Sequence, residues 1–485
     1  MVARSVTLVT VRRLLFPLLL LSLLPACSST PAPTPVPGRT ANDAVHVAGA
    51  AFRDGQGRQL LFRGYNAKVD GIFDVTFDDG RAPNYAFESF DEAAASRFEE
   101  LGFDVLRLPV SWSALEPKPR AYSDAFFAKL DGVLDMAMRH HFWVLLDMHQ
   151  DAYSKEIGED GAPLWAIVPT PTKLLGGPSD DSRRLSQPVL EAGFSFFDDL
   201  AATDGRSLQS AFIAAAGTMA RRYVGRPEVL GFEAFNEPVV LGQGKLDAFH
   251  ARFAEGIHAI DRDAPVLFEP IATRNQNDRA LLPSEPWSHG PGVYAPHVYT
   301  GWFSAPSQNN WASEDPTALA PSMESADQEA RAWTTPLFVT EFGCDQSIAR
   351  GPKWLAAELD LQDRFLTSST AWIWEEKGSW GAVDATRKER DATTRVMARP
   401  YPRAVAGDLL SIERPDPSRL VVHYRATTAT RGLAHEVSAS SAYFVDFKTL
   451  CDGAEVPATR APGRATFTCP ATDGEHTFEV QGTLR

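Results

Sequence analysis

Two glutamates that each follow an apolar, strand-like segment could together perform acid–base chemistry. The first segment begins at Gly231 and ends in Asn236-Glu237-Pro238. The second begins after Pro336 and carries Glu341 at its end. Hydrolysis of a glycosidic bond needs one carboxyl group that gives a proton to the leaving oxygen and another that stays ionised. The pair therefore predicts an enzyme that hydrolyses glycosides.

The separation of the two carboxyl groups would decide the route of the reaction. A gap of about 5–5.5 Å lets the ionised group attack the sugar and retain its configuration, whereas a wider gap admits water and gives inversion. Two carboxyl groups suffice for either route, so we expect no cofactor. His149 and His297 lack the paired spacing of a metal-binding motif, and we expect no metal.

The elements that must position these residues alternate between strands and helices from residue 59 to 375. Strands are predicted at 59–66, 103–109, 142–148, 229–235, 266–269, 293–298, 337–340 and 370–374. Helices are predicted at 89–101, with Ser89 as N-cap, and at 123–141, 207–223, 245–262, 324–333 and 353–367. Eight nearly continuous apolar strands with helical crossovers favour an α/β fold, the (β/α)8 TIM barrel, with its chemistry at the carboxyl ends of the strands. An open doubly wound sheet is the alternative, but no Gly-rich phosphate turn follows the first strand.

Two connections, 152–206 and 300–322, are long for loops and would both lie on the catalytic face. Their aromatic residues could stack on sugars or meet a lipid, or they could pack inside the loops. These residues are Trp165, Trp302, Phe303 and Trp311.

Both ends of the chain differ from the barrel region in composition. Residues 1–27 combine early arginines with a short apolar segment and read as a signal peptide, and Cys27 stands where a bacterial lipoprotein would carry lipid or where simple cleavage would precede secretion. A Pro/Ser/Thr-rich tether is expected at 28–45 and the catalytic barrel at 46–398. Alternating short strands predict an antiparallel β-sandwich at 399–485.

Cysteine usage and charge limit the class of protein further. Export would permit a disulfide between Cys451 and Cys469, and Cys344 is interpreted as a packed thiol. The chain of 485 residues has 47 basic and 62 acidic side chains, a net charge of −15. Such a chain is a poor partner for a phosphate backbone, and we expect no nucleic acid.

The two glutamate motifs resemble those of a known family. Phe235-Asn-Glu-Pro238 and Val339-Thr-Glu-Phe-Gly343 look like the acid/base and nucleophile motifs of the retaining glycosidase clan with (β/α)8 barrels, family 5 in particular. The resemblance implies that Glu237 is the general acid/base and Glu341 the nucleophile. Charge on Glu341 would help Glu237 to keep its proton near neutral pH.

Further residues fit the same resemblance. Asn236 would bind the sugar 2-hydroxyl, and Arg107 would keep Glu341 ionised. His297 and Tyr299 match the sixth-strand His-x-Tyr of the clan, with Tyr299 touching the nucleophile. Trp374 would be the sugar platform after the eighth strand.

A narrower likeness, over residues 46–485, is to the endoglycoceramidases of family 5, which cut between an oligosaccharide and ceramide. It rests on Leu146-Asp-Met-His-Gln-Asp-Ala-Tyr-Ser154, Gly161-Ala-Pro-Leu-Trp165 and Arg399-Pro-Tyr-Pro-Arg403. It implies that Lys68, His149 and Asp151 bind the sugar and that an apolar groove takes the lipid chains.

The predicted function is therefore a retaining endo-β-glycosidase of glycosphingolipids. We expect it to be exported, either secreted or lipid-anchored at the bacterial cell envelope, to be monomeric, and to make peripheral contact with membranes or micelles. A family relative acting on another β-glycoside, such as a steryl glucoside or a β-galactan, remains open. So does a non-catalytic protein that binds carbohydrate or lipid on the same barrel, although the presence of both glutamates argues against it.

Overall fold

The computed structural model describes residues 44–178, 181–299, 316–470 and 472–485, all of which belong to one compact unit. The predicted signal peptide, Cys27 and most of the tether lie outside these residues. The same holds for Trp302, Phe303 and Trp311.

The central sheet is parallel and closes on itself. Its strands are β4 (Arg63–Asn66), β5 (Val105–Ser111), β6 (Trp143–His149), β7 (Val229–Glu233), β8 (Val266–Phe268), β9 (Gly292–Tyr294), β10 (His297–Val298), β11 (Phe338–Phe342) and β12 (Ser368–Ala371). Among the described residues they pair in the order β10-β11-β12-β4-β5-β6-β7-β8-β9. β9 and β10 are two pieces of the expected strand 293–298; β10 pairs with β11, and a bridge joins Tyr294 to Leu337. The ring therefore has eight strands within the described part of the chain, and the predicted (β/α)8 barrel is confirmed.

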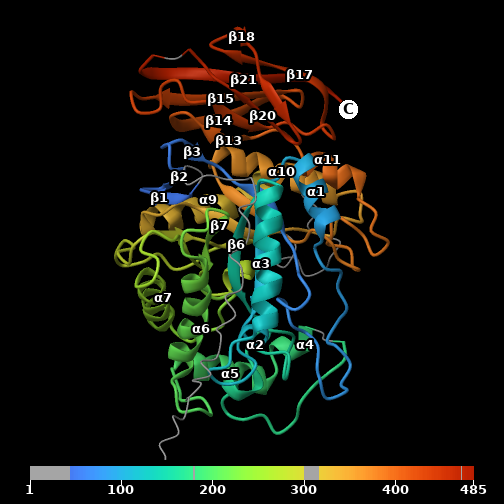
Figure 1. The fold of residues 1–485 in the computed structure, drawn as a ribbon, viewed down its shortest axis with the longest axis vertical. Helices are drawn as coiled ribbons and strands as arrows, with labels where there is room; N and C mark the ends of the chain where they lie inside the picture. Colours follow the sequence, from blue (N-terminus) through green and yellow to red (C-terminus); the bar gives the residue numbers. More distant parts are fainter. Residues whose placement is uncertain (1–43, 179–180, 300–315, 471) are drawn as a thin grey trace, which may run out of the picture. The chain divides into compact units, whose positions relative to one another are not determined.

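Helices cover the outside of this ring, as α3 and α6 do along β6 and β7 in Figure 1. The helices are α1 (Glu92–Glu100), α2 (Trp112–Leu115), α3 (Asp124–Arg139), α4 (Asp181–Arg184), α5 (Gln187–Phe197), α6 (Leu208–Tyr223), α7 (Gln243–His258), α8 (Arg274–Asn277), α9 (Pro316–Trp333), α10 (Gly351–Arg364) and α11 (Asp391–Met397). The expected N-cap Ser89 is wrong. Asp91 caps α1 by accepting from the N–H of Ala94, while the Ser89 hydroxyl accepts from the N–H of Asp70.

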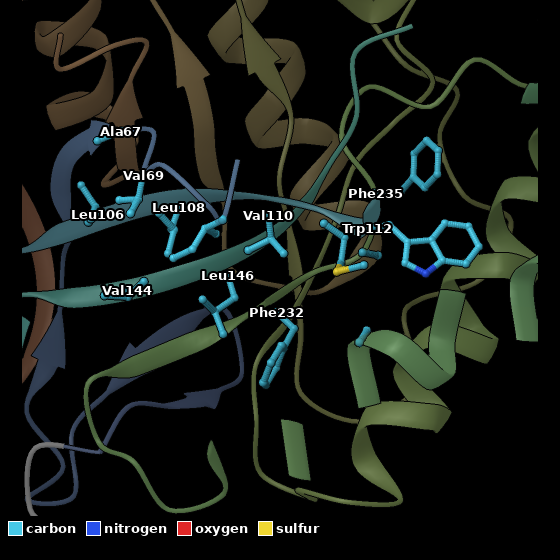
Figure 2. Close-up of a cluster of buried hydrophobic side chains, with 14 of the residues drawn as sticks. Ala67, Val69, Leu106, Leu108, Val110, Trp112, Val144, Leu146, Phe232 and Phe235 are labelled. Atoms are coloured by element: carbon cyan, nitrogen blue, oxygen red, sulfur yellow. The ribbon is translucent and has the colours of Figure 1, made fainter. Parts of the chain in front are cut away.

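Successive side chains of each strand point alternately outward, into an apolar layer beneath the helices, and inward, into the barrel. The inward side chains are apolar at one end of the barrel and polar at the other. Leu106, Leu108 and Val110 of β5 belong to the layer between strands and helices (Figure 2). A separate buried cluster contains Val105, Leu145, Leu230 and other residues from the amino-terminal ends of the strands. At the carboxyl ends the inward positions are polar. The sequence thus places an apolar floor beneath a polar site.

Two antiparallel sheets follow the barrel and share a core. One contains β1 (His46–Ala48), β2 (Ala51–Arg53), β3 (Gln59–Leu60), β13 (Pro402–Val405), β16 (His435–Ser438), β20 (Arg464–Phe467) and β19 (Thr459–Ala461). The other contains β14 (Asp408–Asp416), β15 (Arg419–Ala426), β21 (Gly474–Leu484), β17 (Phe444–Cys451) and β18 (Ala454–Val456). Side chains of both sheets form one apolar cluster, as expected for a sandwich.

The amino-terminal strands β1 to β3 were not foreseen as part of this sandwich. β3 pairs with β13, so residues 46–60 extend the C-terminal sheet instead of the barrel. Phe52, Leu60 and Ala404 pack against the apolar floor of the barrel. The sandwich therefore contains strands from both sides of the predicted boundary between residues 398 and 399.

The cysteine predictions are confirmed. Cys451 and Cys469 form a disulfide with Cα atoms 5.5 Å apart. Cys344 is a buried free thiol, and burial raises its pKa well above the usual value. Within the described residues, no helix combines the length and apolar character needed to cross a bilayer.

Candidate active site

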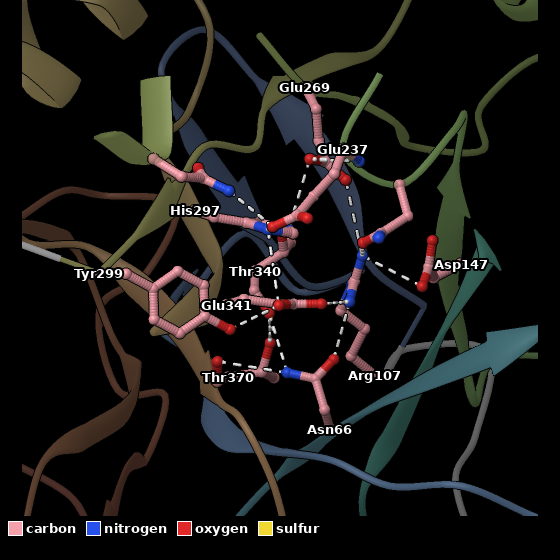
Figure 3. A network of polar contacts seen from close by, with 12 residues as sticks. Asn66, Arg107, Asp147, Glu237, Glu269, His297, Tyr299, Thr340, Glu341 and Thr370 are labelled. Atoms are coloured by element: carbon pink, nitrogen blue, oxygen red, sulfur yellow. Dashed lines mark hydrogen bonds and ion pairs between the residues drawn. The ribbon is translucent and has the colours of Figure 1, made fainter. Parts of the chain in front are cut away.

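Arg107 of β5 stands at the centre of a polar network inside the barrel (Figure 3). Its guanidinium is completely buried and donates to Glu341 Oε1 at 2.6 Å, Glu233 Oε2 at 2.6 Å, Asn66 Oδ1 at 2.8 Å and Asn236 Oδ1 at 2.9 Å. Each partner lies on, or just after, the carboxyl end of another strand. The planar fork of an arginine can serve several acceptors at once, so this side chain fixes the strands' polar ends relative to one another.

The charge of Arg107 is secured by its surroundings. Burial alone would lower the pKa of the guanidinium, but Asp147, Glu233 and Glu341, with Glu269, raise it well above the usual value. The Asp147 carboxylate lies 3.1 Å from Nη2. A permanent cation thus faces the glutamate that is expected to act as nucleophile.

Glu237 and Glu341 come together as the sequence suggested. Carboxylate oxygens of the two residues and a ring nitrogen of His297 all lie within 4.8 Å of one another. β10 and β11 are in register, with His297 opposite Glu341, which brings His297 between the two glutamates. This spacing matches the gap of about 5–5.5 Å in retaining enzymes and is too short for the roughly 6.5–9.5 Å of inverting ones.

Glu341 has two firm hydrogen bonds. Tyr299 donates its hydroxyl to Oε2 at 2.6 Å, and Arg107 binds Oε1. Burial and the charge of Glu341 raise the pKa of the Tyr299 hydroxyl well above its usual value, so Tyr299 remains a donor. Both bonds fix the direction in which the Glu341 carboxyl group points.

Glu237 is held through one oxygen, and the other is left for chemistry. Oε1 contacts Nδ1 of His297 at 2.9 Å and accepts from Asn275 at 2.6 Å. Oε2 has a guanidinium nitrogen of Arg184 at 3.7 Å. Glu237 also has a backbone φ of +43°, a left-handed conformation that non-glycine residues rarely adopt.

The surroundings of Glu237 shift the pKa of its carboxyl in the direction opposite to the expected one. Burial opposes ionisation of Glu237, but the hydrogen bond and the charge of His297 lower the pKa of its carboxyl. Burial also lowers the pKa of His297, but Glu341 and Glu237 outweigh it and raise that pKa. The hydrogen bond between Nδ1 of His297 and Oε1 of Glu237 therefore contains a proton that the two groups share.

Asn236 is fixed on both sides of its amide. Oδ1 accepts from Arg107, and Nδ2 donates to the carbonyl of Gln150 at 3.0 Å. In return, Gln150 donates to the Asn236 carbonyl at 2.7 Å. The amide is thus oriented before any substrate arrives.

The residues expected to bind sugar form a second group beside the glutamates. Lys68 donates to the Tyr85 hydroxyl at 3.1 Å, and its Nζ lies 4.9 Å from the ring centroid of Trp372. The Trp372 ring stacks on His149 with centroids 5.8 Å apart. His149 contacts Asp147 through Nδ1 at 2.5 Å and has Asp151 3.7 Å from Nε2. Burial would lower the pKa of His149, but Asp147 raises it well above the usual value, so the ring is cationic.

Trp374 is not part of this group, which corrects the sequence prediction. It is only 4% exposed and packs edge-on against Tyr65, Phe90 and Phe98 in the outer apolar layer. Strand β12 ends at Ala371, and Trp372 is the partly exposed residue that follows it. The two tryptophans are two positions apart, and sequence alone did not fix where the strand stops.

Besides Trp372, five further residues of the site were not predicted from the sequence: Asp147, Glu233, Glu269, Asn275 and Arg184. Glu233 is the last residue of β7, and Glu269 directly follows β8. A search for acidic residues at strand ends would therefore have found both. Arg184 comes from the long connection after β6 and pairs with Asp151 at 2.8 Å. Nothing local in the sequence indicates that pairing.

Among the residues that the structure describes, three groups of side chains could offer atoms to a cation: His149 with Asp151 and Asp160, Glu233 with Glu269 and His297, and Glu237 with His297 and Glu341. Fixed cations already pair with members of each, since Arg184 binds Asp151 and Arg107 binds both Glu233 and Glu341. The donor sets are therefore explained by ion pairs of the protein itself.

A groove of about 240 Å³ opens beside Glu237. Its walls are largely apolar and include Val189, Leu190, Phe197, Phe235 and Val239, while Gln150, Asp151 and Arg184 line it together with Glu237. Trp165 does not contribute an exposed ring. It is buried on Trp112 at 5.1 Å between centroids and donates to the Glu116 carbonyl.

A (β/α)8 barrel with two facing glutamates, an arginine and a His-x-Tyr pair defines a glycoside hydrolase of the retaining type. The family model described as cellulase (glycosyl hydrolase family 5) matches residues 82–378, more than half of the chain. The chain belongs to glycosyl hydrolase family 5.

Individual relatives agree with this assignment. The chain is 27% identical over 471 residues to endoglycoceramidase I of Rhodococcus hoagii (strain 103S), which covers 90% of this chain and 87% of the relative. The structure is similar to endo-glycoceramidase II from Rhodococcus sp. in its ganglioside GM3 complex, with a TM-score of 0.75, 21% identity and coverage of 90% and 100% of the two chains. Sterylglucosidase 1 of Cryptococcus neoformans shares the fold with a TM-score of 0.70, 13% identity and coverage of 92% and 98%.

Proposed function

We propose that this enzyme is a retaining endo-β-glycosidase that cleaves the bond between an oligosaccharide and ceramide in glycosphingolipids. The observation that carries the proposal is the apolar groove beside Glu237. A general acid must stand next to the leaving group, so the groove is on the aglycone side. Ceramide offers long apolar chains, which suit such walls. The similarity to the Rhodococcus endoglycoceramidases supports the same substrate class.

In the first step, an oxygen of Glu341 attacks the anomeric carbon and the bond to the leaving oxygen breaks. The proton shared by Glu237 and Nδ1 of His297 passes to that oxygen when it resides on Oε2 of Glu237, which leaves Glu237 as a carboxylate. The products are ceramide and a glycosyl ester of Glu341. In the second step, Glu237 takes a proton from water, the water oxygen bonds to the anomeric carbon, and the ester bond to Glu341 breaks.

The remaining site residues hold the sugar in this proposal. Lys68, His149 and Asp151 bind hydroxyl groups, and Asn236 binds the 2-hydroxyl. Trp372 replaces Trp374 as the sugar platform. Arg107 and Tyr299 hold the nucleophile, and His297 holds the acid/base. No metal or cofactor takes part.

The loops after the barrel strands carry an apolar rim, and we propose that it touches membranes or micelles. The rim consists of large exposed hydrophobic residues from the connections after β6, β7, β8 and β11: Leu164, Leu174, Leu185, Leu200, Val239, Leu241, Leu281, Leu282 and Ile348. Leu185 and Val239 also line the groove beside Glu237. Exposed apolar side chains next to such a groove suit a lipid surface.

Export belongs to the same proposal. The disulfide between Cys451 and Cys469 is typical of proteins that fold in an oxidising compartment. The chain is then secreted or carries lipid on Cys27. We also propose that it acts as a monomer.

A panel of substrates tests the proposal. Ganglioside GM3, glucosylceramide, galactosylceramide, a steryl glucoside and aryl β-lactosides are incubated with the wild-type enzyme and with Glu341→Gln, and products are identified by mass spectrometry. We expect intact glycan and ceramide from at least one glycosphingolipid, from the wild type alone. If the enzyme hydrolysed only the steryl glucoside, the inferred aglycone would be a sterol and not ceramide. If it hydrolysed no β-glycoside, the proposal would be contradicted.

A matched pair of variants tests the groove. Val239 lines the groove and is 45% exposed, whereas Val224 is 51% exposed at the opposite end of the barrel. Val239→Asp should raise KM for a glycosphingolipid about ten-fold with little effect on a short aryl glycoside, because a charge disfavours the apolar chains. Val224→Asp should change neither. Equal effects on both substrates would argue against a lipid in the groove.

Vesicle sedimentation tests the rim. The double variant Leu281→Ser/Leu282→Ser should bind phosphatidylcholine vesicles several-fold more weakly than the wild type. The control Val445→Ser/Leu484→Ser removes exposed apolar residues of the sandwich and should bind as the wild type does. If the control lost binding and the rim variant kept it, the sandwich would be the contact surface.

A further inference from the structure

Glu269, which follows β8, has no place in the mechanism given above, yet it touches the acid/base residue. It is 3% exposed. Its Oε2 accepts the backbone N–H of Glu237 at 3.1 Å and lies 3.4 Å from Nε2 of His297. Glu269 is thus adjacent to both groups that handle the catalytic proton (Figure 3).

The contact with the Glu237 backbone stabilises a disfavoured conformation. Glu237 has a positive φ, which is disfavoured for a non-glycine residue and persists only where the surroundings hold it. The peptide N–H of Glu237 is fixed by Glu269, and the preceding carbonyl, that of Asn236, is fixed by Gln150. These two hydrogen bonds decide in which direction the Glu237 side chain leaves the backbone.

His297 connects the same carboxyl to the reacting oxygen. Its Nδ1 contacts Oε1 of Glu237 and its Nε2 faces Glu269, so the ring lies between the two carboxyl groups. The side chain of His297 is completely buried, and Arg274 donates a hydrogen bond to the backbone carbonyl of His297 at 3.0 Å. Rotation of the ring would separate it from both carboxyl groups.

We propose that Glu269 is a positioning residue for the general acid: it fixes the backbone of Glu237 and the ring of His297 in the geometry in which the proton passes between them. This inference rests on the proposed glycosidase function. Glu269 itself touches neither sugar nor leaving group.

The charged groups around Glu269 agree with this role. The surrounding residues are Arg107, 3.6 Å from Oε1, and Glu233, Asp147, Glu237 and His297. Burial and the charge of Glu233 raise the pKa of Glu269 well above its usual value, with Arg107 opposing. A carboxamide matches a carboxyl group in size and also offers an oxygen acceptor, so Glu269→Gln is a close substitute that keeps the acceptor for the Glu237 N–H.

The test compares two leaving groups on the same sugar. 2,4-Dinitrophenyl β-lactoside needs almost no proton from the enzyme, whereas phenyl β-lactoside does. Glu269→Met removes the acceptor at similar size, and we expect kcat/KM to fall about 100-fold for the phenyl glycoside but less than five-fold for the dinitrophenyl glycoside. Glu269→Gln should recover most of the loss. Glu269→Asp, which withdraws the carboxyl by one methylene, should show the same selective loss and serves if the methionine variant does not fold.

The control is Glu228→Gln. Glu228 is completely buried, pairs with Arg226 and lies before β7, at the opposite end of the barrel. It should leave the ratio of the two rates unchanged. An equal loss on both substrates in Glu269→Met or Glu269→Asp, or no loss in either, would overturn the positioning role. If the wild type hydrolysed neither lactoside, the proposed function would itself be in error.

Discussion

The guanidinium of Arg107 lies 2.6 Å from Oε1 of Glu341, and both side chains are buried in the barrel. This pair orients the carboxyl group of Glu341, and the Tyr299 hydroxyl holds its second oxygen by a hydrogen bond. The arrangement makes Glu341 the residue whose loss should have the clearest effect.

Glu341→Gln should abolish turnover without unfolding the protein. The amide cannot attack the anomeric carbon, so kcat should fall on the order of 10⁴-fold or more. Arg107 keeps Glu233 and Asp147 as partners, and the thermal midpoint should therefore stay within a few degrees of the wild type. Steady-state kinetics and a melting curve measure both. Ordinary activity in this variant would move the nucleophile to another residue.

Glu237→Gln should separate the two chemical steps. With a dinitrophenyl glycoside the first step needs no acid, and the glycosyl enzyme then accumulates because no base activates water. We expect a burst of dinitrophenol equal to the enzyme concentration, followed by slow turnover. Azide should accelerate turnover of Glu237→Ala and yield the β-glycosyl azide. An α-glycosyl azide would contradict retention.

Trp372→Ala and Trp374→Ala should fail in different ways. Trp372 is partly exposed beside Lys68 and His149, so its loss should raise KM about ten-fold with little change in stability. Trp374 is buried among aromatic rings, and its truncation should cost about 3–5 kcal/mol of unfolding free energy. Denaturant unfolding measures the stability of the two variants, and steady-state kinetics measure their KM values. The reverse pattern would restore Trp374 as the platform.

Glu358 of α10 should make stability fall as pH rises. It is fully buried, and burial, with the charge of Asp278, raises its pKa to about 8. The folded state therefore binds this proton more tightly than the unfolded chain. The contribution is complete below the unfolded pKa of about 4.3 and is lost as pH rises through about 8, at roughly 1.4 kcal/mol per pH unit.

Glu358→Gln should remove this part of the pH dependence. The variant should gain unfolding free energy relative to the wild type between pH 5 and pH 9, by a few kcal/mol at the upper limit. Glu324→Gln on α9, whose side chain is 53% exposed, is the control and should follow the wild-type curve. Parallel curves for Glu358→Gln and the wild type would show that the buried carboxyl does not titrate in this range.

The barrel and the catalytic pair could be predicted from the sequence because both leave local patterns in it. Apolar runs mark the strands, and Glu237 and Glu341 follow two of them directly. Glu269 and Asn275 were missed because their role depends on which strands become neighbours, and pairing of β8 with β7 is not visible in either segment alone. Trp372 and Trp374 were confused because the answer depends on where one strand ends. The strands β1 to β3 were too short to be recognised without their partner, β13.

The pairing of β3 with β13 joins the first folded residues to a sheet built from the last ones. A catalytic fragment that stopped at residue 398 would lose that partner strand and expose the apolar floor of the barrel, where Phe52 and Leu60 pack. Any shortened version of the enzyme must therefore retain both β3 and β13. The sandwich covers the apolar end of the barrel and is needed to keep it buried.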